Sequence, residues 1–178
     1  MRQVNIDRQA SDICIRTRAE GMLSRLAHDL EIRVAEFQAS VQREDERWQV
    51  EIRIPVDQLR VAGVLKRGRV DTNTLSAKDV REIERKIRSE VFAGLHEVRV
   101  DGTGRGNRGD IKIQGPRGEQ SVFVQLNVNE SGDEGRTVAR GRVNASMKRL
   151  GIKEVKAPLG AFKVADSVEI EGCLVLTD

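Results

Sequence analysis

The chain has 178 residues, of which 38% are hydrophobic and 33% are charged, a composition typical of a globular protein with its own core. Its 31 basic and 28 acidic residues leave a net charge of +3, and only 3% of the residues are aromatic. This mixed charge and the scarcity of aromatic rings argue against nucleic-acid binding, either by a basic surface or by base stacking.

The sequence contains neither a recognisable signal peptide nor a membrane-spanning segment. The N-terminal stretch MRQVNIDRQAS lacks the apolar core of a signal peptide, and no apolar run reaches the ~18 residues of a membrane span. We therefore expect one domain over residues 1–178, without a membrane span and located in the cytoplasm, or in the periplasm if a leader has been removed.

Alternating apolar and polar residues predict β-strands along most of the chain. The segments at 12–17, 32–41 and 47–55 place on one face Ile13, Ile15, Ile32, Val34, Trp48, Val50, Ile52 and Ile54. The alternation shifts by one residue near Ala35 and Glu36, which is the pattern of a β-bulge. The charged stretch REDER before Trp48 predicts a hairpin turn.

Residues 76–92 predict one amphipathic helix. Ser76 is a suitable N-cap and Asp79 lies in the first turn. Apolar residues then recur at helical spacing, so the helix packs one face on an apolar surface; these residues are Val80, Ile83, Ile87 and Val91.

The second half of the chain returns to strand alternation. The apolar positions include Val98, Val100, Ile111, Ile113, Val122, Val124, Leu126, Val128, Ala139, Gly141, Val143, Ala145, Val168, Ile170, Gly172, Leu174 and Leu176. The glycine-rich stretch GTGRGNRGD links two strands without a following helix, so we expect a loose hairpin rather than a phosphate site. The small residues Ala139, Gly141 and Ala145 indicate close packing or room inside the sheet.

The pattern of about eight strands, each with one apolar face, predicts a mainly β fold: an eight-stranded antiparallel barrel closed on itself. Closure removes the exposed strand edges that a long open sheet would have. Such a barrel either is filled by its own side chains or holds one slender ligand, and alternation does not decide between the two.

Several segments, in order along nearly the whole chain, resemble the YceI-like polyisoprenoid-binding family. They are NIDRQAS, SRLAHDL, IRIPVDQLRV, the helix with the following GLHEVRV, IKIQGPRGEQSVFVQL and GIKEVKAPLGAFKVADSVEIEG. The resemblance implies a lipocalin-like barrel whose tunnel takes a long isoprenoid or acyl chain. Each candidate lining residue, taken alone, is more simply explained as an ordinary core residue. The candidates are Ile13, Ile15, Ile32, Val34, Val50, Ile52, Ile54, Val98, Val100, Ile113, Leu126, Val143, Leu174 and Leu176.

The segment SRLAHDL, residues 24–30, looks like a short helical plug across one end of the barrel. Leu23, Leu26 and Leu30 would then point inward, while His28 and Asp29 cap the turn. Two hypotheses for His28 stay open: a polar group satisfied within a lid, or a contact to the polar head of a ligand at the tunnel mouth.

The sequence carries no motif of a known catalytic site, such as GxSxG, HExxH or a P-loop. We therefore expect non-catalytic binding of a polyisoprenoid, prenyl quinone or fatty acyl chain, as carrier, store or sensor, with no metal and no cofactor apart from a co-purified lipid. The alternative is a ligand-free barrel that acts as a protein-interaction module, for instance through Arg136, Arg140 and Arg142. A homodimer stays open.

Two further expectations concern particular segments. The stretch KRLGIKEVKAPLGAFKV is cationic through Lys148, Arg149, Lys153, Lys156 and Lys163, and is expected either at the tunnel mouth, where it favours an acidic or polar head, or as a solvated loop. Cys14 and Cys173 point outward from the first and last strands, which pair in a closed barrel. We expect two free thiols under a covering segment, such as the helix with Ile83 and Ile87.

Overall fold

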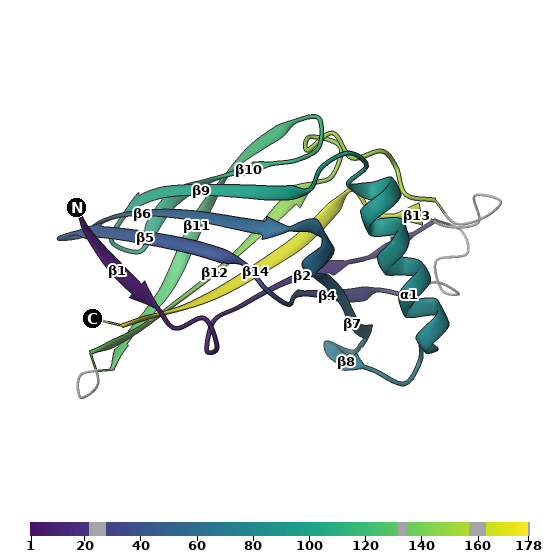
Figure 1. Cartoon of the computed structure of the whole chain (residues 1–178), viewed down its shortest axis with the longest axis horizontal. Coiled ribbons are helices and arrows are strands. Elements are labelled where there is room, and N and C mark those ends of the chain that lie inside the picture. The colour runs from purple at the N-terminus through teal and green to yellow at the C-terminus, as the bar shows by residue number, and fades with distance from the viewer. Residues whose placement is uncertain (22–27, 132–134, 157–162, 178) are drawn as a thin grey trace.

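A computed structural model describes residues 1–21, 28–131, 135–156 and 163–177. Eight antiparallel strands form a closed ring, in which the last strand pairs with the first (Figure 1). The predicted eight-stranded barrel is thereby confirmed. In ring order the strands are β1 (Arg2–Ile6), β5 (Gln38–Glu44), β6 (Arg47–Pro55), β9 (Glu97–Arg105), β10 (Arg108–Gln114), β11 (Glu119–Ser131), β12 (Arg136–Ser146) and β14 (Ser167–Thr177).

Four further strands extend the same sheet from β14 at one end of the ring: β2 (Asp12–Thr17), β4 (Leu30–Val34), β7 (Leu59–Lys66) and β8 (Arg69–Asp71). Three short connections join the ring to this extension, from β1 to β2, from β4 to β5 and from β6 to β7. The bend at residues 35–37 falls where the alternation shifts in the sequence. The bend after β6 follows Pro55, which lacks the N–H needed to continue a ladder, and forms the 3-10 turn η2 (Val56–Gln58). A separate pair is formed by β3 (Ala19–Glu20) and β13 (Lys163–Val164).

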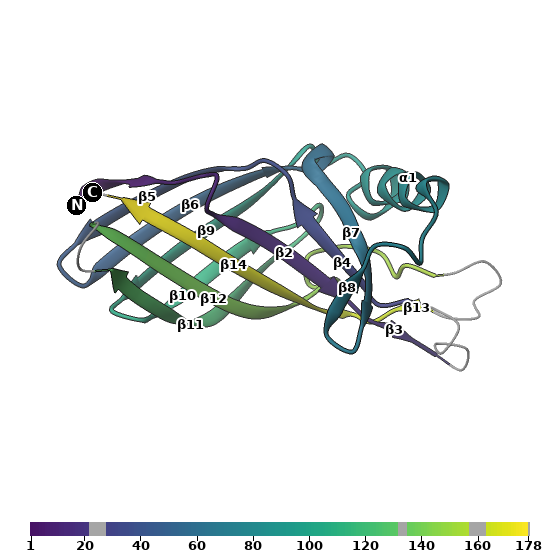
Figure 2. The ribbon, with the colours of Figure 1, turned by 90° about the horizontal axis from the view of Figure 1, so that it is seen from below.

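The two ends of the barrel differ (Figure 2). Both termini, the turn between β5 and β6 and the turn between β9 and β10 lie at one end, which we call the terminus end. The helix, the turn between β10 and β11 and the segment between β12 and β14 lie at the other, which we call the helix end.

The predicted helix is present as α1 (Ala77–Lys86), which continues into a π-helical turn, η3 (Ile87–Val91). Ser76 caps it: its hydroxyl accepts the N–H of Asp79 at 3.2 Å, and the Asp79 carboxylate accepts the N–H of Ser76 at 3.0 Å. Glu84 fastens the helix to the sheet, because its carboxylate accepts the N–H of Val61 in β7 at 3.0 Å. None of the described helices is long and apolar enough to cross a membrane.

Most buried apolar side chains belong to two clusters. The first consists of Ile13, Ile32, Val34, Phe37, Ile54, Val56, Leu59 and Ile87, and the second of Ile113, Ala145, Met147, Leu150, Ile152 and Val168. Further buried apolar residues outside these clusters include Val41 in β5, Val124 in β11 and Val175 in β14.

Cys14 and Cys173 lie on neighbouring strands, because β2 pairs with β14 and places Cys14 opposite Glu171. The predicted pairing of these two strands is confirmed, and both cysteines are buried free thiols. Burial raises the pKa of the Cys14 thiol. The expected cover is wrong, because Ile83 and Ile87 of the helix face the barrel interior and not the outer surface.

Candidate functional site: an apolar tunnel through the barrel

A cavity of about 1360 Å³ runs inside the barrel. Small-molecule sites usually span roughly 300–1,000 Å³, so this one is large. Its lining includes Arg43 and Glu130 at the terminus end as well as Lys86 and Lys153 at the helix end. The cavity is therefore a tunnel that reaches both rims.

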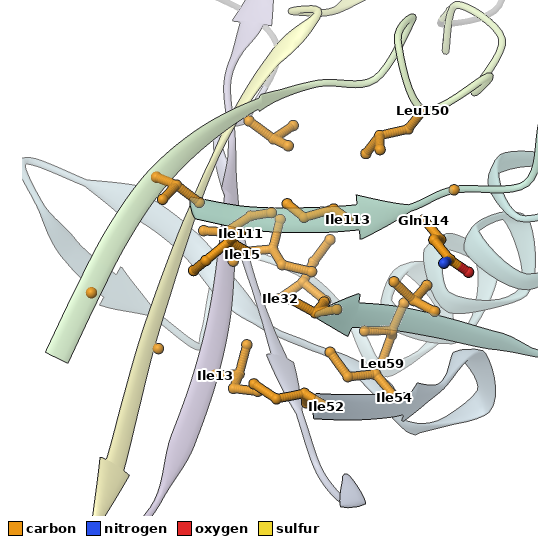
Figure 3. A pocket seen from close by; sticks show the side chains of 18 of the residues that line it. Ile13, Ile15, Ile32, Ile52, Ile54, Leu59, Ile111, Ile113, Gln114 and Leu150 are labelled. Atoms are coloured by element: carbon orange, nitrogen blue, oxygen red, sulfur yellow. The ribbon is translucent and has the colours of Figure 1, made fainter. Parts of the chain in front are cut away.

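The wall of the tunnel is the inward face that strand alternation produces. Isoleucine and leucine side chains from several strands converge on one space in Figure 3, among them Ile13, Ile52 and Ile113. All but one of the sequence-predicted site residues line the tunnel: Ile13, Ile15, His28, Ile32, Val50, Ile52, Ile54, Val98, Val100, Ile113, Leu126, Val143, Leu174 and Leu176.

Val34 is the exception. It is buried in the first core cluster, opposite Leu59 and together with Phe37. Val34 is the last residue of β4, directly before the bend at residues 35–37, and it is not among the residues that line the tunnel.

The structure adds lining residues that the sequence did not single out for the site. The additional lining residues in strands fit the same alternation of inward and outward side chains. Those on the helix and after β12 line the tunnel only because segments distant in the sequence fold over the end of the barrel. They include Leu59, Ile83, Ile87, Phe92, Ile111, Val124, Val128, Met147, Leu150, Ile152 and Ile170.

His28 is exposed and lines the tunnel at the helix end. The predicted plug falls largely on residues 22–27, which lie outside the described residues. His28 and Asp29 are not helical, and Leu30 begins β4. The Asp29 carboxylate accepts the N–H of Ala19 at 2.8 Å, so it connects the strands on either side of the segment.

Side chains leave the middle of the tunnel unfilled. Gly141 and Gly172 lie opposite each other in β12 and β14, and both line the tunnel. A Cβ added to Gly172 would meet no atom within 4 Å. Ala145, by contrast, is 1% exposed within the second core cluster. The room therefore lies at Gly172 of β14, whereas the small residues of β12 pack closely: a Cβ on Gly141 would come within 3.0 Å of Leu126 and Val124.

The glycine-rich hairpin is tighter than expected. The ladder between β9 and β10 continues to Arg105 and Arg108, which leaves a turn of only Gly106 and Asn107. Its glycines stand beside Trp48: a Cβ on Gly109 would come within 2.5 Å of the indole ring. The prediction of a loose hairpin is therefore wrong, because these glycines make room for a ring from β6.

Charged side chains mark the two rims. At the helix end the lining cations are Lys86, Arg117, Lys153 and Lys156, and the anions are Glu90 and Glu154. At the terminus end the lining contains one cation, Arg43, and two anions, Glu46 and Glu130. Among the described residues the balance is thus positive at the helix end and negative at the terminus end.

The predicted cationic segment contributes to this rim in part. Lys153 and Lys156 line the tunnel, whereas Lys163 does not, and residues 157–162 lie outside the described residues. Glu154 binds Lys156 at 2.8 Å and Lys163 at 2.7 Å, and these two ammonium groups lower the pKa of Glu154 to about 2. Its charge is therefore compensated locally.

The described residues contain no group of three or more histidine, cysteine, aspartate or glutamate side chains placed to hold a metal ion. The features present are an apolar lumen and two polar rims. The interaction that such a lining offers is burial of apolar surface.

Neither a protein-family model nor a curated protein sequence matches the chain. Among solved structures, it is similar to the crystal structure of Burkholderia cenocepacia BcnA, with a TM-score of 0.66. The likeness covers 97% of this chain and 100% of that chain, at 14% sequence identity. At this identity it shows the fold alone, which is a lipocalin-like barrel.

Proposed function

We propose that the barrel binds one long, apolar molecule without catalysis, namely a polyisoprenoid, a prenyl quinone or a fatty acyl chain, and acts as its carrier, store or sensor. The observation that carries the proposal is the tunnel of about 1360 Å³, whose wall is apolar and whose centre the protein's own side chains leave unfilled. The resemblance of the sequence to the YceI-like family and the likeness of the fold to BcnA support it, and with it membership of that family. A cytoplasmic location stays a prediction.

The driving force would be burial of the chain in a dry lumen. At roughly 0.8 kcal/mol per methylene, about fifteen methylenes contribute about 12 kcal/mol before costs. Association itself costs an estimated 4–15 kcal/mol or more. Short chains would therefore bind weakly, and the tunnel would select ligands by length.

The alternative of a ligand-free interaction module has less support. Of the three arginines that suggested a cationic surface, Arg136 is paired with Asp7 at 3.0 Å and Arg142 with Glu171 at 2.9 Å. These two arginines neutralise carboxylates of the barrel and are therefore less available to a protein partner. In addition, an interaction module that works through its surface has no need of an empty lumen.

Two measurements test the proposal. Purified protein is extracted with organic solvent and analysed by mass spectrometry, which we expect to recover a prenyl or acyl lipid. In parallel, Gly172→Phe should fill the lumen and weaken binding of hexadecanoic acid by about tenfold, equivalent to about 1.4 kcal/mol.

The matched control is Asn127→Phe, an exposed position of β11 outside the tunnel lining. It should bind as the unchanged protein does, and both variants should keep the circular dichroism of the barrel. Equal binding by the two variants, or no binding of any long chain, would overturn the proposed function.

A further inference from the structure

Trp48 is the chain's only tryptophan, and it lines the tunnel near the terminus end. It lies opposite Gly104 of β9, and its ring occupies the space that a side chain at Gly104 or Gly109 would take. The indole N–H donates to the Gly106 carbonyl at 3.0 Å. The ring is thus fixed against the wall of the barrel, and the lumen continues past it.

Two lining cations, Arg117 and Lys153, come from neighbouring segments at the opposite rim. Gly151, with a φ of +74°, lies so close to Arg117 that a Cβ on it would come within 2.6 Å of the arginine's own Cβ. The N–H of Arg117 donates to the Leu150 carbonyl at 3.3 Å. This close approach brings Arg117 to the segment that carries Lys153, and both side chains line the tunnel.

These two cations are not neutralised within the described part of the chain. Neither Arg117 nor Lys153 forms an ion pair with another described residue, whereas Lys86 and Lys156 pair with Glu82 and Glu154. Of the two lining anions here, Glu154 is compensated by two lysines, and Glu90 stands on the helix side of the rim. A ligand anion would find its charge partners at Arg117 and Lys153.

We propose that the tunnel holds a single-chain amphiphile with an anionic head, a carboxylate or a phosphate, in one orientation. The head lies at the helix end beside Arg117 and Lys153. The chain passes the paired glycines Gly141 and Gly172, and its far end lies against the indole of Trp48. The orientation rests on the proposed function and adds to it the class of head group and the direction of the chain.

The first test uses Trp48 as a reporter, because bromine quenches indole fluorescence only at short range. The probes are α-bromohexadecanoic acid, with bromine beside the head, and ω-bromohexadecanoic acid, with bromine at the tail. Binding of both is measured separately by equilibrium dialysis. We expect the ω-bromo acid to quench Trp48 several-fold more strongly than the α-bromo acid.

Equal or reversed quenching by two probes that both bind would overturn the orientation and leave the proposed function intact. Failure of both acids to bind in dialysis would overturn the proposed function and the orientation with it. The variant Trp48→Phe, which lacks the reporter, gives the background.

The second test addresses the head group. The double variant Arg117→Gln, Lys153→Gln should weaken binding of hexadecanoic acid by about tenfold and leave the affinity for hexadecanol unchanged. The control is Lys148→Gln, Arg149→Gln, which removes two cations of the same segment that do not line the tunnel. Comparison of hexadecyl phosphate with hexadecanoic acid shows which anion the rim prefers. Equal losses for acid and alcohol, or none for either anion, would overturn the head-group assignment.

Discussion

At Gly104 the absence of a side chain gives the indole of Trp48 its place on the barrel wall. A methyl group there would overlap the ring atom Cζ2 of Trp48 and the Arg108 carbonyl. We therefore expect Gly104→Ala to lower the free energy of unfolding by about 1–3 kcal/mol, the usual cost of overpacking. Urea unfolding followed by Trp48 emission measures both the loss and the altered surroundings of the ring.

The matched control is Gly172→Ala, at a strand glycine that also faces the lumen but has no atom within 4 Å of the added Cβ. Its stability should stay within about 1 kcal/mol of the parent, since alanine replaces a more flexible glycine. If Gly104→Ala behaves like Gly172→Ala, Trp48 does not lie against the wall.

The sequence predicts single lining residues well wherever strand alternation is regular. Ile13, Ile15 and Ile52 point into the tunnel as expected. The contact between Trp48 and Gly104 could not be predicted, because it depends on the register of β6 against β9, whose paired residues are far apart in the sequence. In the sequence, Trp48 is explained as a strand residue and the glycines as a turn. Only the pairing of β6 with β9 brings the ring and the glycines into contact.

The helix covers an edge of the sheet that has no strand partner along part of its length. In the described structure β7 pairs with β4 and β8, and the N–H of Val61 is bound by the Glu84 carboxylate. We expect Glu84→Ala to leave that N–H without its partner. Hydrogen exchange at the Val61 amide should then accelerate, and the free energy of unfolding should fall by roughly 1–3 kcal/mol.

The control for this helix is Glu82→Ala, which removes only an exposed pair with Lys86 at 3.8 Å. Such pairs contribute about 0.3–0.5 kcal/mol. Protection of the Val61 amide that is identical in the two variants would contradict an anchoring role for Glu84.

At the level of elements, the helix and most strands could be predicted, because each carries its own periodicity and its own cap or turn. The position of the helix could not. The apolar stripe of the helix shows that it packs on an apolar surface but not on which one. The outer surface around the two cysteines and the interior of the barrel were both suitable. Ile83 and Ile87 turn inward because the chain leaves β9 where β6 ends at Pro55, and the helix covers the interior there.

For the molecule as a whole, an ionic network joins β2 and β4 of the extension to β14 and β12 of the ring. Arg16 of β2 binds Glu169 and Glu171 of β14 at 2.8 Å each and Glu31 of β4 at 3.0 Å. Arg142 of β12 binds Glu171 at 2.9 Å. The hydrogen bond from Arg16, with that from Arg142, lowers the pKa of Glu171.

This network makes the attachment of β2 to β14 sensitive to acid. Because the pKa of Glu171 is lower in the folded protein, the unfolded chain binds the proton first as the pH falls. The stabilising contribution of the ionised Glu171 is present above a pH of about 4.5, the ordinary pKa of a glutamate. It is lost as the pH drops through the lower pKa that Glu171 has in the folded protein. Glu171→Gln should lose about 1 kcal/mol at pH ~7 and show a shallower decline in acid than the parent.

Urea unfolding at neutral and acidic pH measures this difference. Glu36→Gln serves as the control, since Glu36 is exposed and outside the network, and it should decline as the parent does. An acid decline as steep in Glu171→Gln as in the parent would show that Glu171 does not contribute to the pH dependence.

The pairing of β1 with β14 also allows the two ends of the chain to be joined covalently. Asn5 lies opposite Thr177, so the two chain ends stand side by side at the terminus end (Figure 1). A short peptide linker could join them, and new ends could be opened at a surface hairpin, such as the turn at Asp45, without a change in the order of the strands. Any tag, tether or fused domain, at whichever end it is attached, would stand beside the rim near Trp48. The opposite rim would stay accessible in every such design.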